Sequence, residues 1–321
     1  MTRRALRNVS ASVRTRLLNR SREKDEDFQF LLQRYAAERF LHRLGESEYR
    51  SSLVLKGAML LALWGESTYR PTRDLDFTGH GDARQGSIRS AIRAVCSVPV
   101  VEDGIVFDAE TMSMEPFHEH LEYSGVRARF WSRVGSARIQ VRIDIGFGDA
   151  IQPPPIDARY PTLLDGSPQP WIRAYPPEAV VAEKLHAMVL LGEQNSRYKD
   201  FYDIYSLAKY VSFTAERLTR SIITTFERRR TAISADLPHS LTPQFYAEPD
   251  RAAQWRAYLI RNSLPGAPDD FRVVGDVIQA FLVGPWLALE RGSAISGTWA
   301  TGGPWEPRCR ESMNDERADD T

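Results

Sequence analysis

The chain has 321 residues, with 42 Lys and Arg balanced by 42 Asp and Glu, so its formal net charge is zero. Hydrophobic residues make up 42% and charged residues 26%, which is the balance of a globular protein and argues against disorder of the whole chain. The length suffices for a sizeable core and about two domains. Neutral overall charge excludes a generally basic nucleic-acid binder, so any such surface must be a local patch.

The two cysteines, Cys96 and Cys309, lie far apart in the sequence. Their separation excludes a zinc-finger spacing and a disulfide framework, and it favours a reducing compartment. No run approaches about 18 continuous apolar residues, so we expect no membrane partner. The basic N-terminus lacks the apolar core of a signal peptide. We therefore expect a cytoplasmic protein.

The first 24 residues are rich in arginine and almost free of acid. A solvated helix or loose arm is the interpretation we favour, and an RNA-contacting arm is the alternative. Apolar residues from Phe28 to Leu44 then recur at helical spacing, and Gly45 ends this helix. Residues 1–50 are thus predicted to form a basic arm and a helix that covers the following sheet.

Residues 53–77 read LVLKGAMLLALWGESTYRPTRDLDF. They predict a strand, a helical segment from Ala58 to Trp64 and a second strand. Residues two apart on a strand point to the same face, so Asp74 and Asp76 project together. Paired carboxylates repel each other unless a cation lies between them, and Mg²⁺ is commonly held by one or two carboxylates plus phosphates. A solvated strand end is the alternative for an isolated Asp-x-Asp motif.

Residues 138–145, RIQVRIDI, alternate apolar and polar side chains and predict a half-buried strand with Asp144 on its polar face. Beside the first carboxylate pair, Asp144 would complete a three-acid set suited to two-metal nucleotidyl transfer. The turn at Lys56 and Gly57 would let backbone N–H groups approach phosphate. The Pro-rich residues 153–177 predict a linker, so we expect an α/β domain at 51–170. The motif His118-x-His120 favours a surface loop over a metal site.

The second half of the chain has helical patterns, and we expect an α-helical domain at 171–290. Lys184 lies in the middle of one helix, and Asp200 and Asp203 share a face of the next. Spacing alone favours ordinary pairs here, such as Lys199 with Asp203 at i,i+4. Gly, Ser, Thr and scattered charge then predict a disordered tail at 291–321.

Four segments together resemble the AbiEii/AbiGii nucleotidyltransferase toxins, which include the MenT-type toxins. They are LVLKGAMLLALWG…YRPTRDLDF, RIDIGFGDAI, YPPEAVVAEKLHAMV and NSRYKDFYDIYSL. The resemblance runs from Phe28 to Leu287 and implies a DNA-polymerase-β-like nucleotidyltransferase core, a mixed sheet with helices, followed by an α-helical domain. It also implies a toxin, paired with an AbiEi-like antitoxin, that adds nucleotides from an NTP to the 3′ acceptor end of tRNA and so blocks aminoacylation and growth.

The resemblance also implies roles for individual residues. Asp74 and Asp76 match the family's metal-binding pair and Asp144 the third carboxylate, which implies a two-ion Mg²⁺ site. Catalytic roles are implied for Lys184 and Asp200 as well. The nucleotide is expected to contact Lys56, Gly57, Ala58, Arg73 and Lys184. Ala58 departs from the Gly-Ser turn of many nucleotidyltransferases, so backbone contacts to phosphate are kept and a hydroxyl contact is lost.

Thr72 occupies a hydroxyl position at which some relatives are silenced by antitoxin-linked phosphorylation. A phosphate there would place negative charge against Asp74 and compete with the substrate triphosphate. Intact mass after co-expression with the antitoxin tests this hypothesis, and an unmodified but inactive toxin would point to another route.

Two alternatives to tRNA modification stay open. One is nucleotidylation of a small molecule or a protein, and the other is a non-enzymatic binding protein that keeps the fold. A transfer assay on RNA, protein and aminoglycosides separates the substrate classes. An RNA-directed enzyme should also lose substrate affinity steeply as salt rises.

Overall fold

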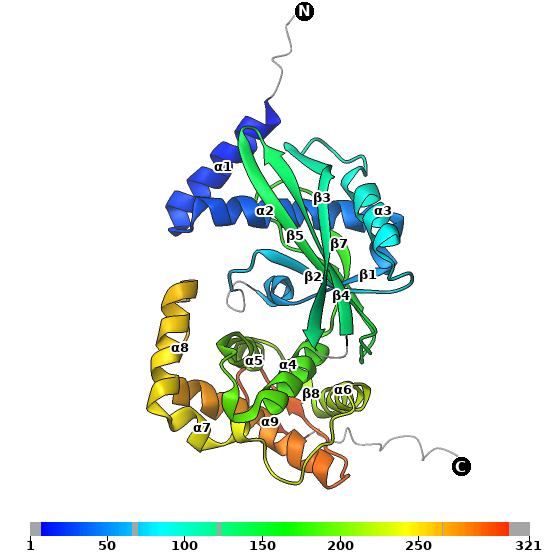
Figure 1. The fold of residues 1–321 in the computed structure, drawn as a ribbon. Coiled ribbons are helices and arrows are strands. Elements are labelled where there is room, and N and C mark those ends of the chain that lie inside the picture. Colours follow the sequence, from blue (N-terminus) through cyan, green and yellow to red (C-terminus); the bar gives the residue numbers. More distant parts are fainter. Residues whose placement is uncertain (1–7, 66–69, 121–122, 265, 308–321) are drawn as a thin grey trace, which may run out of the picture. The chain divides into compact units, whose positions relative to one another are not determined.

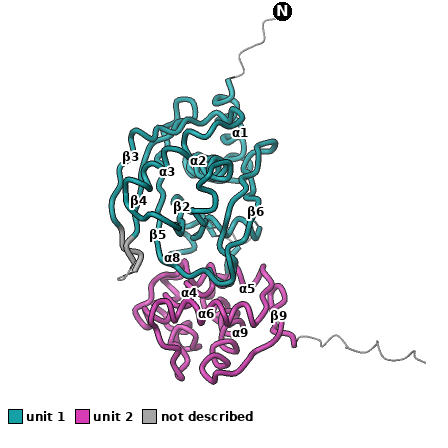
Figure 2. Tube along the Cα trace, turned by 90° about the vertical axis from the view of Figure 1, so that its right-hand side faces the viewer, with its two compact units in different colours: residues 1–180, 258–267 teal, residues 181–257, 268–321 magenta. Residues whose placement is uncertain are grey.

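The computed structural model describes residues 8–65, 70–120, 123–264 and 266–307. The chain divides into two compact units, coloured in Figure 2. The first comprises residues 1–180 and 258–267, and the second comprises residues 181–257 and 268–321. The first unit thus extends past the domain border expected at residue 170.

A seven-stranded mixed sheet forms the framework of the first unit in the described residues (Figure 1). Its strands lie in the order β3-β4-β5-β2-β1-β7-β6. The pairs β2–β5 and β1–β7 are parallel, and the other neighbours are antiparallel. The strands are β1 (Leu53–Lys56), β2 (Asp74–Gly79), β3 (Ile105–His120), β4 (Tyr123–Val134), β5 (Ala137–Phe147), β6 (Ile156–Arg159) and β7 (Trp171–Ala174). The mixed α/β architecture predicted from the sequence is confirmed.

One face of this sheet is apolar because alternate residues of its strands are hydrophobic. Leu75, Ile143 and Ala128 lie opposite one another on β2, β5 and β4 and are buried. On this side Phe40 of helix α2 packs against Phe130, with ring centroids 6.2 Å apart. The helices and short 3-10 helices of this unit are α1 (Val9–Lys24), α2 (Phe28–Gly45), η1 (Glu48–Ser51), η2 (Ala58–Trp64) and α3 (Gln85–Cys96). The polar side chains of these strands therefore lie on the other face of the sheet, away from α2.

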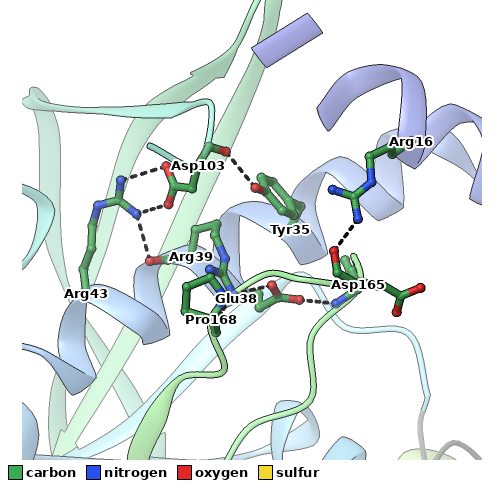
Figure 3. Close-up of polar contacts among 9 residues, drawn as sticks. Arg16, Tyr35, Glu38, Arg39, Arg43, Asp103, Asp165 and Pro168 are labelled. Carbon is green, nitrogen blue, oxygen red and sulfur yellow. Dashed lines mark hydrogen bonds and ion pairs between the residues drawn. The ribbon is translucent and has the colours of Figure 1, made fainter. Parts of the chain in front are cut away.

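Polar contacts fix α2 in place (Figure 3). Glu38 accepts a hydrogen bond from the backbone N–H of Leu163 at 2.6 Å, and Arg39 donates to the carbonyl of Pro168 at 2.9 Å. Leu163 and Pro168 both belong to the loop between β6 and β7. Arg43 donates two hydrogen bonds, of 2.7 and 3.1 Å, to the carboxylate of Asp103 just before β3. The helix is thereby held to both halves of the sheet.

Two expectations about loops were wrong. Residues 153–177 contain β6 and β7 rather than a linker, and Ala174 of β7 pairs with Leu55 of β1 inside the sheet. These strands have only four residues each and are bracketed by prolines, which hides them in a sequence pattern. His118 and His120 lie on β3 and not in a loop.

The second unit is mainly helical and also carries a small sheet, ordered β10-β9-β8. Phe201, Phe245 and Phe271 form part of its buried core, with ring centroids 5.3 to 6.3 Å apart. Helices α4 and α8 cross from one unit into the other. Its elements are α4 (Pro177–Leu191), η4 (Gly192–Gln194), α5 (Tyr198–Tyr210), β8 (Phe213–Thr214), α6 (Ala215–Arg228), η5 (His239–Leu241), α7 (Pro243–Ala247), α8 (Pro249–Asn262), α9 (Phe271–Glu290), β9 (Thr298–Trp299) and β10 (Trp305–Glu306).

The segment expected to be a disordered tail is ordered up to residue 307. Trp299 is only 2% exposed, and the ring of Trp305 stacks on Phe281 with centroids 5.9 Å apart. Two tryptophans thus anchor a stretch whose small polar residues suggested disorder. Residues 308–321 lie outside the described residues.

Helix α9 is long and apolar enough to cross a membrane by length and composition alone. This is weak evidence, because a core helix of a soluble protein passes the same test. The buried side chains of Val274, Ile278 and Phe281 lie on this helix, which contacts α5, α6 and α7. One side of α9 therefore belongs to the core of the second unit.

Candidate active site

Four charged residues form a row across the polar face of the sheet, one on each of four neighbouring strands. Lys56 on β1 lies opposite Asp76 on β2, Asp76 opposite Asp144 on β5, and Asp144 opposite Arg127 on β4. Asp74 lies two residues before Asp76 on the same face. The predicted meeting of the three acids on one sheet face is confirmed in register. We call these five residues the charged sheet face.

Arg127 holds Asp144 through both carboxylate oxygens. Its Nε lies 2.7 Å from Oδ1 and its Nη2 lies 2.6 Å from Oδ2. The pKa of Arg127 is raised, chiefly because of these hydrogen bonds. The side chain of Asp144 is 8% exposed and that of Arg127 is 27% exposed. A charge-assisted bidentate pair of this kind has defined geometry as well as strength.

Asp74 is only partly satisfied by its neighbours. Its Oδ2 accepts a hydrogen bond of 3.2 Å from Arg142, whereas its Oδ1 is buried without a hydrogen-bond partner among the described residues. A buried carboxylate oxygen without a partner is costly. A cation beside Oδ1 would remove that cost, so this carboxylate fits a metal ligand.

Gly57 is required by the position of Asp76. Its backbone φ is +72°, a left-handed conformation that favours glycine. A Cβ atom at this position would lie 2.1 Å from Oδ2 of Asp76. The Asp76 carboxylate therefore rests directly on the backbone of the turn. The segment that follows, η2, is a 3-10 helix of seven residues rather than an α-helix.

Lys56 lies in a buried polar network that sequence analysis did not find. Its Nζ is 3.0 Å from Oδ2 of Asp149, and the hydroxyls of Thr78 and Tyr175 lie 2.9 and 3.2 Å from the same oxygen. The Lys56 side chain is 5% exposed. The position of Thr78, two residues after Asp76, could have indicated this network. Asp149 and Tyr175 lie in irregular segments, where spacing carries no such signal.

Of the remaining predicted residues of this stretch, Thr72 and Arg73 directly precede β2, and Ala58 begins η2. Arg73 is exposed, Thr72 is partly buried and Ala58 is buried. Residues 66–69, between Ala58 and Thr72, lie outside the described residues.

The donor set has the right chemistry for Mg²⁺, although it is not assembled as a closed cage. Within the described residues, no group of three or more His, Cys, Asp or Glu side chains is placed to hold a metal ion. Two carboxylates with substrate phosphates and water suffice for Mg²⁺, however. Asp74 and Asp76 meet that requirement by strand position, whereas both oxygens of Asp144 already accept a hydrogen bond from Arg127.

The other predicted residues lie in the second unit. Nζ of Lys184 on α4 is 3.1 Å from Oδ1 of Asp200 and 2.5 Å from Oδ2 of Asp203, and Arg197 donates to Asp200 at 2.7 Å. We call these four residues the Lys184 cluster. Burial raises the pKa of Asp200, but the nearby charges of Lys184, Arg197 and Lys199 outweigh it, so the net shift is downward. The structure thus brings Lys184 and Asp200 together, as part of a buried ion cluster.

Comparison with known proteins identifies the family. A family model described as nucleotidyl transferase AbiEii toxin, type IV TA system, matches residues 39–277, well over half of the chain. No curated protein matches. The crystal structure of JHP933 from Helicobacter pylori is 14% identical over 83% of this chain and 95% of its own, with a TM-score of 0.47. An H. pylori protein described as a candidate nucleotidyltransferase is 15% identical over 84% of this chain and 100% of its own, with a TM-score of 0.47. The chain therefore belongs to the AbiEii nucleotidyl transferase toxin family of type IV toxin–antitoxin systems.

Proposed function

We propose that the charged sheet face transfers a nucleotidyl group from an NTP to the 3′ acceptor end of tRNA and so blocks aminoacylation. Family membership implies nucleotidyl transfer, a nucleotide substrate and an antitoxin partner. The acceptor, the Mg²⁺ ions and an AbiEi-like antitoxin are our proposals. The observation that carries them is the register of Asp76 with Asp144, beside an Asp74 oxygen that is buried and has no hydrogen-bond partner in the part of the chain that the structure describes.

The reaction joins the acceptor hydroxyl oxygen to the α-phosphorus and breaks the bond from that phosphorus to the β-phosphate. Pyrophosphate leaves, and we propose that Asp144, once Arg127 has released it, assists removal of the hydroxyl proton as a carboxylate beside the cation. Asp74 and Asp76 would hold the cation, which neutralises the triphosphate and lowers the pKa of the attacking hydroxyl. The protein contributes mainly position and charge, because phosphoryl transfer needs little covalent chemistry from side chains.

The triphosphate contacts are proposed for the solvent-accessible cations near the carboxylates. Arg73 is exposed and directly precedes Asp74. Lys56 is 5% exposed and bound to Asp149, which favours a structural role over the predicted phosphate contact. The backbone of Gly57 stays available in our proposal, although its left-handed turn serves first to admit Asp76.

The test is a transfer assay with each α-labelled NTP in turn, on total RNA, cell protein and aminoglycosides. Label is expected in tRNA, and sequencing of tRNA 3′ ends should show added nucleotides. Asp76→Asn is expected to reduce transfer by about a thousandfold, because it removes a charged metal ligand. The matched control is Asp157→Asn, an acid on β6 whose side chain is 50% exposed and pairs with Arg50.

The outcome of this assay decides between the acceptor classes. Label in protein or aminoglycoside but not in RNA would overturn tRNA and favour the alternative substrates. Full activity of the Asp76→Asn protein would remove the charged sheet face from the chemistry altogether.

A further inference from the structure

The two ends of the charged row are built differently. Arg127 at one end is 27% exposed and binds Asp144 directly. Lys56 at the other end is 5% exposed and is fixed by Asp149, itself in contact with two hydroxyls. Lys56 is therefore locked in place, whereas Arg127 has room to change partner.

A second carboxylate lies within reach of Arg127. Nη1 of Arg127 is 4.0 Å from Oε1 of Glu115 on β3, whose side chain is 47% exposed. The guanidinium therefore already lies between a buried acid and an exposed one. Exposed ion pairs are weak, so a rotation of Arg127 toward solvent costs little on the Glu115 side.

The hydrogen bonds of Arg127 use both oxygens of Asp144. Arg127 takes one lone-pair site on each oxygen and places a positive charge beside both, so its guanidinium disfavours a divalent cation at the same carboxylate. Once released, the planar guanidinium presents paired N–H donors, which match the geometry of phosphate oxygens.

We propose that Arg127 is an exchangeable partner of Asp144 that yields this carboxylate to the divalent cation and then binds the triphosphate of the incoming nucleotide. The inference rests on the proposed function of the charged sheet face. It couples the two ligands, because cation binding at Asp144 frees the group that holds the nucleotide. Such coupling is reciprocal, so bound nucleotide should also raise the affinity of the protein for the cation.

The decisive variant is Arg127→Gln, studied in the full chain. Removing the competitor should tighten Mn²⁺ binding roughly tenfold, the scale of one charged hydrogen bond. It should also weaken a non-hydrolysable NTP analogue by a similar factor, again roughly tenfold. Arg127→Lys keeps the charge but not the paired contact, so both of its affinities should be intermediate. Mn²⁺ alone, and the analogue with Mn²⁺, are measured by calorimetry at pH 8, with circular dichroism to verify folding.

The matched control is Arg133→Gln, an exposed arginine six residues away on the same face of β4. It should leave both affinities unchanged. Asp76→Asn provides the second reference, because it should remove Mn²⁺ binding whatever Arg127 does.

The possible results separate the two proposals. If Asp76→Asn abolishes Mn²⁺ binding but Arg127→Gln does not tighten it, the exchange is overturned and the proposed metal site stands. If Arg127→Gln binds Mn²⁺ more tightly but binds the nucleotide analogue with wild-type affinity, the proposed contact between Arg127 and the triphosphate is overturned. If the wild type binds no Mn²⁺, or Asp76→Asn binds it equally well, both proposals fail.

Discussion

The charged sheet face and the Lys184 cluster use the same residue types in opposite ways. On the sheet, the side chains of Arg127 and Asp74 are 27% and 31% exposed, and one buried oxygen of Asp74 has no hydrogen-bond partner among the residues described. In the Lys184 cluster, Asp200 and Asp203 are 1% and 0% exposed, and Lys184 is 13% exposed. On the sheet, Asp74 and Arg127 reach solvent although Lys56 and Asp144 are 5% and 8% exposed, whereas both carboxylates of the Lys184 cluster are buried and paired with Lys184.

This difference distinguishes a catalytic role for the sheet residues from a structural role for the Lys184 cluster. An ion pair with solvent access can exchange its partner for a ligand at small cost. A buried ion pair that loses one partner leaves an uncompensated charge in a medium of low dielectric. The family resemblance implies one catalytic set made of Asp74, Asp76, Asp144, Lys184 and Asp200. Their surroundings favour metal chemistry for the acids on the sheet and a structural role for the two residues of the Lys184 cluster.

Lys184→Met should have the largest effect on stability, and it tests whether the Lys184 cluster is structural. It leaves two buried carboxylates short of a cation, so we expect a loss of about 3–5 kcal/mol in the free energy of unfolding. Urea unfolding at pH 7 measures it. Lys24→Met is the control, because the side chain of Lys24 on α1 is exposed and lies outside the cluster, and an exposed substitution changes stability by less than about 0.5 kcal/mol.

The structural role of the Lys184 cluster would be contradicted if the Lys184→Met protein kept its stability and lost nucleotidyl transfer. Lys184 would then act on the triphosphate, as the family resemblance implies, and the buried cluster would be part of the active site. Activity of the folded fraction, assayed below the unfolding transition, distinguishes this from simple loss of structure.

The two regions also differ in how far the sequence predicted them. The alternation in residues 138–145 placed Asp144 on a polar strand face, and its register with Asp76 followed once the strands were neighbours. The bidentate contact with Arg127 was not predictable, because β4 carries several arginines and its register with β5 is a long-range property. Spacing alone indicated an exposed Lys184. The prediction failed because other helices bury this position, and the residue pattern of a helix does not show which helices pack against it.

Gly57→Ala is expected to have the next largest effect. The backbone of Gly57, with φ +72° and ψ −161°, costs a residue with a Cβ about 1–3 kcal/mol, and the new methyl would lie 2.1 Å from Oδ2 of Asp76. Asp76 must therefore move. We expect transfer to fall by about a hundredfold, the cost of misplacing a catalytic group by about 1 Å.

Gly86→Ala is the control for that substitution. Gly86 lies in α3, and a Cβ atom there meets no other atom within 4 Å. Transfer by this variant should match the wild type. Equal losses in both variants would mean that the Gly57 turn does not position Asp76 for catalysis.

The smallest effect compares Asp200 with Glu38, which is also buried. Burial raises the pKa of Glu38 and is only partly opposed by Arg39, whereas the neighbouring cations leave the pKa of Asp200 lowered. A lowered folded-state pKa gives stability that is present above the unfolded value of about 3.9 and is lost as the pH falls through the folded value. A raised pKa gives stability that is present below the unfolded value of about 4.3 and is lost as the pH rises through the folded value.

The stability differences between the wild type and the variants Asp200→Asn and Glu38→Gln should therefore change in opposite directions between pH 2.5 and pH 7. Each unit of pKa shift corresponds to about 1.4 kcal/mol. Urea unfolding across this range measures both slopes. The wild type should gain stability over Asp200→Asn as the pH rises and lose stability relative to Glu38→Gln. Slopes of the same sign would show that Arg39 compensates Glu38 as fully as Lys184 compensates Asp200, and that closed ion clusters occur in both units.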